Sequence, residues 1–249
     1  MTDVLATTGF AEGDFRVGRV FNRTFSVLSR NFLPFCLVTA VAGMLRLLIA
    51  LPSASTLRGG GVSAGWFLVE LLLGVVIYKI SEAVVLYGAF EDMRGRPVHL
   101  VESLRVGLRR IFAVLGVAVL VPILAGLATF LLIVPGFILL SMLFVAMPAC
   151  VVEKLGPLKS MGRSAELTKG HRWKVFGLYI LTLLAGTILG ALLTGLSRFV
   201  AGPIVSLVVT LAWSAVFIAF YAIVVVVTYH DLRVAKEGVN TDQIAAVFD

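Results

Sequence analysis

A run of 42 residues, from 111 to 152, contains no Asp, Glu, Lys or Arg. At 1.5 Å per residue, one straight helix of that length would extend roughly 63 Å, about twice the hydrocarbon thickness of a membrane. The run therefore predicts a hairpin of two membrane helices. Pro135-Gly136 is the expected turn, because proline and glycine interrupt helices.

The rest of the 249-residue chain is similarly apolar, with 59% hydrophobic residues, 14% charged residues and a mean hydropathy of +1.03. Soluble domains carry about 25% charged residues, so soluble, disordered and collagen-like classes are excluded. Runs of membrane-spanning length occur at 32–51, 66–90, twice within 111–152, at 175–196 and at 204–228. We expect an all-α polytopic membrane protein, a single domain over 1–249, with six transmembrane helices arranged as three hairpins.

The positions of the basic residues predict the orientation in the membrane. The net charge is +7, and 17 of the 21 Lys and Arg residues lie before the first predicted span or after the second, fourth and sixth. Arg58 and Arg198 lie in the segments on the other side. Since cytoplasmic loops carry the excess of Lys and Arg, both termini are expected in the cytoplasm.

Each predicted hairpin is preceded by a short basic segment with helical periodicity, at 15–31, 99–112 and 157–173. Short helices with an apolar stripe and a cationic face lie in the plane of the membrane interface. The sequence therefore predicts three units, each an interfacial helix followed by a hairpin, at approximately 13–95, 96–156 and 157–238, with a cytoplasmic tail at 239–249.

The segments that follow the three hairpins also resemble one another: EDMRGRP, EKLGP and HDLRVAKEG each contain an acid, then a base, then glycine. Recurrence of the same elements in the same order favours internal repetition and a three-fold pseudosymmetric bundle. The alternative is that any loop at headgroup level collects such residues.

Four ionisable residues fall inside the predicted spans: Arg46, Glu70, Lys79 and Glu82. Burying a charge in a membrane costs a few kcal/mol, so each is expected to have a partner or water. Matched depths in the first hairpin predict an Arg46–Glu70 pair, and Lys79 and Glu82 share a helix face. One interpretation is two structural ion pairs; the other is a polar track for an ion or a lipid headgroup.

Nothing in the sequence indicates catalysis or metal binding. Cys36 and Cys150 lie in apolar runs, and His99, His171 and His230 lie on separate segments without ligand spacing. Motifs of hydrolases, nucleotide-binding proteins and metalloproteases are absent. The sequence therefore predicts a protein that is not an enzyme and has no cofactor or metal. Nucleic acid is not an expected partner, because the basic residues flank apolar runs.

The run of Glu153, Gly156, Pro157, Arg163-Ser164, Leu167-Thr168, Gly170 and Trp173 resembles a broad bacterial family of six-span inner-membrane proteins. That family is related to the membrane domain of glycerophosphoryl diester phosphodiesterases. The ending VVVTYHDLRVAKEG and the N-terminal FNRTFSVLSRNFLPF are also similar, so the resemblance covers nearly the whole chain. It implies the bacterial inner membrane and a role near lipid metabolism or envelope homeostasis, without phosphodiesterase activity, since no hydrolase domain is present.

The leading hypothesis is a multi-pass inner-membrane protein that binds or organises anionic lipid through its three basic helices. The residues expected to contact lipid headgroups are Arg19, Arg23, Arg109, Arg110, Arg163 and Arg172. A first alternative is a small transporter or lipid-handling permease that uses Arg46, Glu70, Lys79 and Glu82. A second is an accessory membrane subunit of another enzyme; protein partners and homo-oligomerisation stay open.

Overall fold

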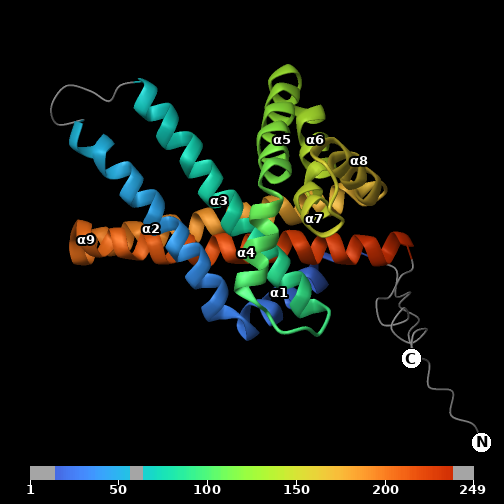
Figure 1. Ribbon diagram of the computed structural model, residues 1–249, viewed down its shortest axis with the longest axis horizontal. Helices are drawn as coiled ribbons and strands as arrows, with labels where there is room; N and C mark the ends of the chain where they lie inside the picture. The colour runs from blue at the N-terminus through green and yellow to red at the C-terminus, as the bar shows by residue number, and fades with distance from the viewer. Residues whose placement is uncertain (1–14, 57–63, 238–249) are drawn as a thin grey trace, which may run out of the picture.

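A computed structural model describes residues 15–56 and 64–237, and every regular element in these ranges is an α-helix (Figure 1). The helices are α1 (Val17–Arg30), α2 (Phe32–Thr56), α3 (Ala64–Met93), α4 (Leu100–Arg109), α5 (Ile111–Leu131), α6 (Ile133–Leu143), α7 (Ala146–Val152), α8 (Pro157–Thr168) and α9 (Arg172–Glu237). The all-α class is therefore confirmed. The predicted tail 239–249 and Arg58 lie outside the described residues.

Four helices in the described part of the chain are long and apolar enough to cross a membrane, and the prediction of six was wrong. These four are Phe32–Leu51, Ile111–Phe130, Val134–Val152 and Arg172–Glu237. The predicted span 66–90 lies within α3, which carries three charged residues there and is not among the four. The predicted spans 175–196 and 204–228 both lie in α9, a single element of 66 residues.

The α9 element folds back on itself at Gly202, where the backbone has φ +83° and ψ −177°. This left-handed conformation favours glycine, and Pro203 follows where a new helical stretch begins. The two halves of α9 are in contact, because the Trp213 indole Nε1 donates to the Gly186 carbonyl oxygen at 3.2 Å. The hydroxyls of Thr194 and Thr210 are also 3.2 Å apart. Thr194 and Thr210 are each eight residues from Gly202, as expected for the two halves of an antiparallel hairpin.

The uncharged run 111–152 forms the expected hairpin, but the turn lies three residues before Pro135. Leu132 is extended, with φ −154° and ψ 127°, and separates α5 from α6. Pro135 then falls in the first turn of α6, where its missing N–H has no intrahelical partner to lose. Gly136 faces Thr129 of α5 so closely that a Cβ atom would collide with it. The glycine therefore permits close packing of the hairpin and does not form the turn.

The C-terminal part of α9 is the buried centre of the fold. The stretch from 222 to 232 is buried on all sides, including Thr228, Tyr229, His230 and Asp231. It is surrounded by α1, α3, α7 and α8, which contribute most of the remaining core. Helices that are apolar all round become central in this way, and here the centre also contains polar residues that need partners.

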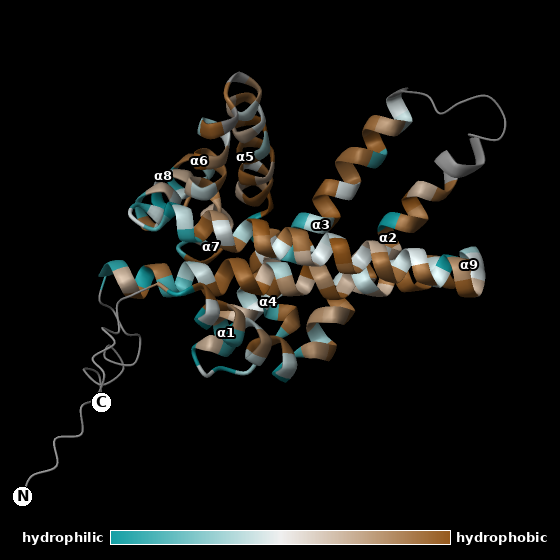
Figure 2. Cartoon of the chain, turned by 180° about the vertical axis from the view of Figure 1, so that it is seen from behind, coloured by the Kyte–Doolittle hydropathy of each residue, from teal (hydrophilic) through white to brown (hydrophobic). Residues whose placement is uncertain are grey.

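The hairpins extend outward from this centre and expose apolar side chains along their length (Figures 1 and 2). The exposed residues include Phe112, Phe199 and Phe130, the last of which is 90% exposed. An apolar surface of this extent is typical of membrane contact. The structure thus supports a membrane protein with several apolar helices.

The three predicted basic segments form the helices α1, α4 and α8. Each precedes a pair of antiparallel helical stretches: α2 and α3, α5 and α6, and the two halves of α9. The order of elements therefore recurs as the sequence predicts. Superposition of the three units, and the unit boundaries at 13–95, 96–156 and 157–238, stay predictions.

Candidate functional site

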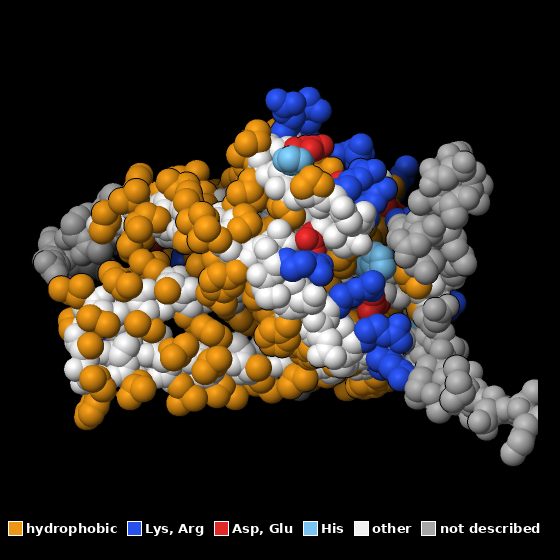
Figure 3. Space-filling view, turned by 90° about the horizontal axis from the view of Figure 1, so that it is seen from below, with side chains coloured by type: hydrophobic (Ala, Val, Ile, Leu, Met, Phe, Trp, Pro, Cys, Tyr) orange, Lys and Arg blue, Asp and Glu red, His pale blue; other side chains and the backbone are white. Residues whose placement is uncertain are grey.

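Charged side chains gather at one end of the molecule, while hydrophobic side chains cover the opposite end (Figure 3). The described charged groups at this end come from α1, α4, α8, both ends of α9 and the segments that join them. We call this region the basic end. It brings together helices that are far apart in the sequence, and it contains all six arginines that the sequence predicts to contact lipid headgroups.

At the basic end, α1 is held by carboxylates that follow the hairpins. Arg23 Nη1 donates to Asp231 Oδ1 at 2.7 Å, and the Asp231 side chain is only 6% exposed. Arg30 Nη2 donates to Asp92 Oδ2 at 2.6 Å, and Asn31 Nδ2 donates to Asp92 Oδ1 at 2.8 Å. Arg23 therefore satisfies a buried charge in α9 and attaches α1 to the core.

A second cluster attaches α8 to α7 and to the end of α9. Arg163 Nε donates to both carboxylate oxygens of Glu153 at 3.0 and 3.1 Å, and Arg163 Nη2 donates to Glu237. The Tyr229 hydroxyl donates to Glu153 Oε1 at 2.7 Å, and Arg233 Nε donates to Glu237 Oε2 at 2.8 Å. We call these five residues the carboxylate cluster.

Arg163 is strongly bound within the carboxylate cluster, and its side chain is 22% exposed. Burial alone would lower the pKa of Arg163, but the hydrogen bonds to Glu237 and Glu153 outweigh burial and raise that pKa. Its guanidinium donors are therefore directed at protein carboxylates, in a geometry that joins three helices.

The sequence did not predict the role of Ser164, the neighbour of Arg163 in α8. Ser164 Oγ donates to the Met142 carbonyl oxygen at 2.6 Å and accepts the Val145 backbone N–H at 3.2 Å. It thus satisfies backbone groups where the chain passes from α6 to α7. The spacing of Ser160, Ser164 and Thr168 in the sequence could have indicated this role, because it places three small hydroxyl side chains on one face of α8, and that face is buried.

The α4 helix differs from α1 and α8, because its apolar face is exposed. Val101 is 78% exposed, and Leu104 and Leu108 are also exposed. These residues line a groove of about 550 Å³ whose other walls are α2 and α3. Arg105 and Arg109 are exposed on the same helix, and neither has a hydrogen bond or ion pair to another described residue. An apolar face beside two unpaired cations is the pattern of an interfacial helix.

Arg110, which follows α4, has a different environment from Arg109. Its Nη1 donates to the Lys154 carbonyl oxygen at 2.7 Å, near the end of the second hairpin. One of its donors therefore joins α4 to the segment between α7 and α8.

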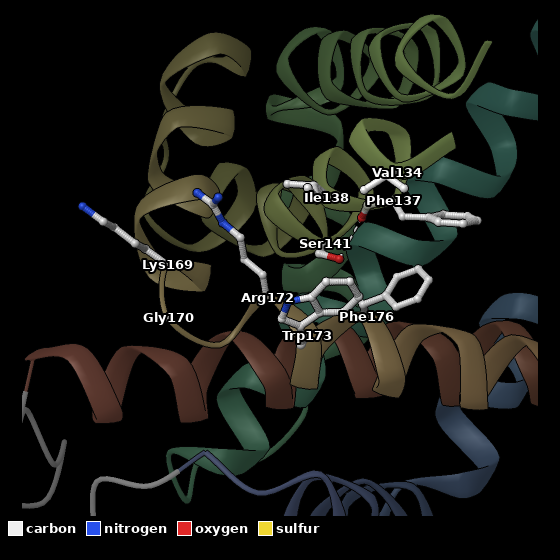
Figure 4. A pocket seen from close by; sticks show the side chains of 9 residues that line it. All are labelled: Val134, Phe137, Ile138, Ser141, Lys169, Gly170, Arg172, Trp173 and Phe176. Carbon is white, nitrogen blue, oxygen red and sulfur yellow. Dashed lines mark hydrogen bonds between the residues drawn. The ribbon is translucent and has the colours of Figure 1, made fainter. Parts of the chain in front are cut away.

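A second groove, of about 380 Å³, lies between α6 and the beginning of α9 (Figure 4). Its walls are apolar: Phe137 and Phe176 pack with ring centroids 5.0 Å apart, and Trp173 meets Phe176 edge to face. In Figure 4 the Trp173 ring lies beneath Ser141, while Val134 and Ile138 complete the α6 wall. We call this the α6–α9 groove.

Two cations, Lys169 and Arg172, line the mouth of the α6–α9 groove beside Gly170. Gly170 has φ +89°, and this turn brings the end of α8 next to the start of α9. The Arg172 Nε atom is buried and has no hydrogen-bond partner among the described residues. In Figure 4 Lys169 extends away from the apolar walls. The groove therefore combines an apolar interior with a cationic mouth, and one donor there is unsatisfied.

Three of the four ionisable residues inside the predicted spans have identified partners. Lys79 Nζ donates to Glu82 Oε2 at 2.6 Å, so this predicted shared face is confirmed as an ion pair. The Arg46 guanidinium lies 5.4 Å from the centre of the Tyr78 ring and also contacts Gly74 of α3. Glu70, one turn before Gly74, also has an interaction within the protein, and the Arg46–Glu70 pair stays a prediction.

The six predicted headgroup arginines thus divide by environment. Arg23 and Arg163 bind carboxylates, Arg110 binds a carbonyl, and Arg19 also has an interaction within the protein. Arg109 and Arg172 are the two whose side chains form no hydrogen bond or ion pair with a described residue.

Comparison with known proteins yields no further assignment: no protein-family model, no curated protein and no solved structure matches this chain. The resemblance to the bacterial six-span family therefore stays a prediction. The function is accordingly argued from the basic end alone.

Proposed function

We propose that the protein resides in the bacterial inner membrane, with its basic end in the cytoplasm, and binds and organises anionic lipid there without catalysing a reaction. The observation that carries the proposal is α4: its exposed apolar face lies beside Arg105 and Arg109, which have no hydrogen bond or ion pair to a described residue. The concentration of cations at one end supports the orientation, because Lys and Arg are retained on the cytoplasmic side.

The proposed mechanism is electrostatic and hydrophobic at once. The side chains of Val101, Leu104 and Leu108 insert among acyl chains, which places the α4 backbone at headgroup depth. Each of the neighbouring arginines then gains about 1 kcal/mol from an anionic leaflet. A zwitterionic leaflet offers the same apolar environment but not this attraction, so the preference for anionic lipid originates in the arginines.

The role of α1 and α8 in this proposal is to position the site. Their arginines Arg23 and Arg163 hold the two helices against α9. The surface available to bind lipid headgroups is therefore smaller than the sequence suggests, and it consists of α4 and the mouth of the α6–α9 groove.

The alternative of a transporter has less support. Lys79 is paired with Glu82, and Arg46 packs on Tyr78. The two apolar grooves described above are lined by none of Arg46, Glu70, Lys79 and Glu82. These contacts favour the structural interpretation of the intramembrane charges.

Exchanging Arg105 and Arg109 for glutamine tests the proposal. We expect the double variant to bind phosphatidylglycerol about 25-fold more weakly at the α4 surface, because each arginine contributes about 1 kcal/mol, or about fivefold. In a lipid titration this loss should appear in the dissociation constants of the lipids that bind second and later, since the first lipid is expected at another site, the α6–α9 groove. Native mass spectrometry of the detergent-solubilised protein, titrated with phosphatidylglycerol or phosphatidylcholine, resolves each bound lipid.

The matched control is Arg198→Gln, which removes an exposed cation from the opposite end of the molecule. It should leave every dissociation constant unchanged. Equal affinity of the wild-type protein for the two lipids, or an equal loss in Arg198→Gln, would refute the proposal.

A further inference from the structure

The α6–α9 groove has features that general attraction to an anionic leaflet does not require. Its apolar walls come from two helices that are distant in sequence, and Trp173 remains 76% exposed beside them. A volume of about 380 Å³ is within the range of small-molecule sites, which extends from about 300 to 1,000 Å³. The groove is therefore large enough for part of a chain-like apolar ligand.

The charges at the mouth of the groove favour a ligand with an anionic group. Lys169 and Arg172 are both cationic, and neither forms an ion pair with a described carboxylate. Three of the carboxylates at the basic end are used elsewhere: Glu153 and Glu237 bind Arg163, and Asp231 binds Arg23. Glu166 of α8, one turn before Lys169, is 75% exposed and lies 3.8 Å from Arg163 Nη1, without an ion pair to Lys169. An anionic group at the mouth would thus meet positive charge that no described carboxylate neutralises.

A ligand that occupies the whole groove must match both its apolar interior and its cationic mouth. An apolar ligand would leave the charges of Lys169 and Arg172 at the mouth of the groove without a counter-ion. A small soluble anion would leave the aromatic walls exposed to water. An anionic phospholipid satisfies both, with its phosphate at Lys169 and Arg172 and one acyl chain along Phe137, Ile138 and Phe176.

We propose that the α6–α9 groove holds a single anionic phospholipid, bound more tightly than the lipids around α4. This inference rests on the function proposed above and specifies one site within it. Arg172 supplies the directional donors, because a guanidinium matches phosphate geometry, and Lys169 adds a mobile charge.

The test is the affinity for the first bound lipid. In Lys169→Gln/Arg172→Gln, we expect the dissociation constant for the first phosphatidylglycerol to rise at least tenfold, with little change for phosphatidylcholine. Filling the groove with Ile138→Trp should abolish this first binding event for both lipids. Retention time on size exclusion and helical circular dichroism of each variant report whether the fold is intact.

The Arg105→Gln/Arg109→Gln variant is the matched control, because it should weaken the later lipids and leave the first unchanged. An excess of glycerol phosphate should not displace the first lipid if the acyl chain contributes to binding. Displacement by glycerol phosphate, or an unchanged first dissociation constant in Lys169→Gln/Arg172→Gln, would overturn the inference. If phosphatidylglycerol is preferred only at the later sites, the groove assignment fails and the proposed function stands; if it is preferred nowhere, both fail.

Discussion

Arg163→Gln is expected to destabilise the protein by about 2–3 kcal/mol, at the lower end of the cost of breaking a buried ion pair because the side chain is partly exposed. The substitution removes the guanidinium that joins Glu153 and Glu237, and leaves two carboxylates close to one another. It also removes the ion pairs that join α8 to Glu153 after α7 and to Glu237 at the end of α9. The shift in the midpoint of unfolding by sodium dodecyl sulfate, measured on the detergent-solubilised protein, reports this loss.

The control for this prediction is Lys159→Gln, an exposed cation on the same helix. It should shift the midpoint by less than about 0.5 kcal/mol, as surface substitutions usually do. The folded fraction of Arg163→Gln should bind phosphatidylglycerol with the same preference over phosphatidylcholine as the wild-type protein. A stable Arg163→Gln with reduced lipid affinity would instead identify Arg163 as a headgroup ligand.

Gly186→Ala is expected to destabilise the protein by about 2–3 kcal/mol, because the added methyl group overlaps the Phe217 ring where the two halves of α9 meet. The Phe217 ring is stacked on Trp213, whose indole donates to the Gly186 carbonyl, so neither ring moves independently. The same titration with sodium dodecyl sulfate measures the effect.

Gly177→Ala, in the same half of α9, is the control, since its added methyl group meets open space. It should be neutral or stabilising by up to about 1 kcal/mol, because alanine favours helix more than glycine does. Equal stability of Gly186→Ala and the wild-type protein would contradict the folded-back arrangement of α9.

The sequence was sufficient for the features that depend on local periodicity and hydrophobicity. It predicted the helical class, the first span at 32–51, the hairpin in 111–152 and the three basic helices before α2, α5 and α9. It also placed Lys79 and Glu82 on one face of a helix, and three residues of separation are enough for that inference.

The features that it missed depend on contacts between distant segments. The turn after α5 lies at Leu132, because Pro135 is tolerated in the first turn of α6 and Gly136 is needed for packing against Thr129. The number of candidate membrane helices is four, because α9 is one element bent at Gly202 and α3 is not among the four.

The assignment of the arginines changed for the same reason. From the sequence, Arg23 and Arg163 are simply cations on the polar faces of helices. Their partners Asp231 and Glu153 belong to the recurrent acids after the hairpins, and both pairs involve a helix from a different unit. The recurrent motif thus serves to attach basic helices to the core, and fewer arginines are left to bind lipid.

If the basic end binds anionic lipid from the surrounding leaflet, that lipid should stay with the protein when it leaves the membrane. The measurement is to extract the wild-type protein and Arg105→Gln/Arg109→Gln from bacterial membranes as native copolymer nanodiscs and to determine the anionic fraction of the retained lipid. We predict a fraction above that of the bulk membrane for the wild type, and a fraction closer to the bulk value for the variant. A wild-type fraction equal to or below the bulk value would contradict the binding of anionic lipid at the basic end.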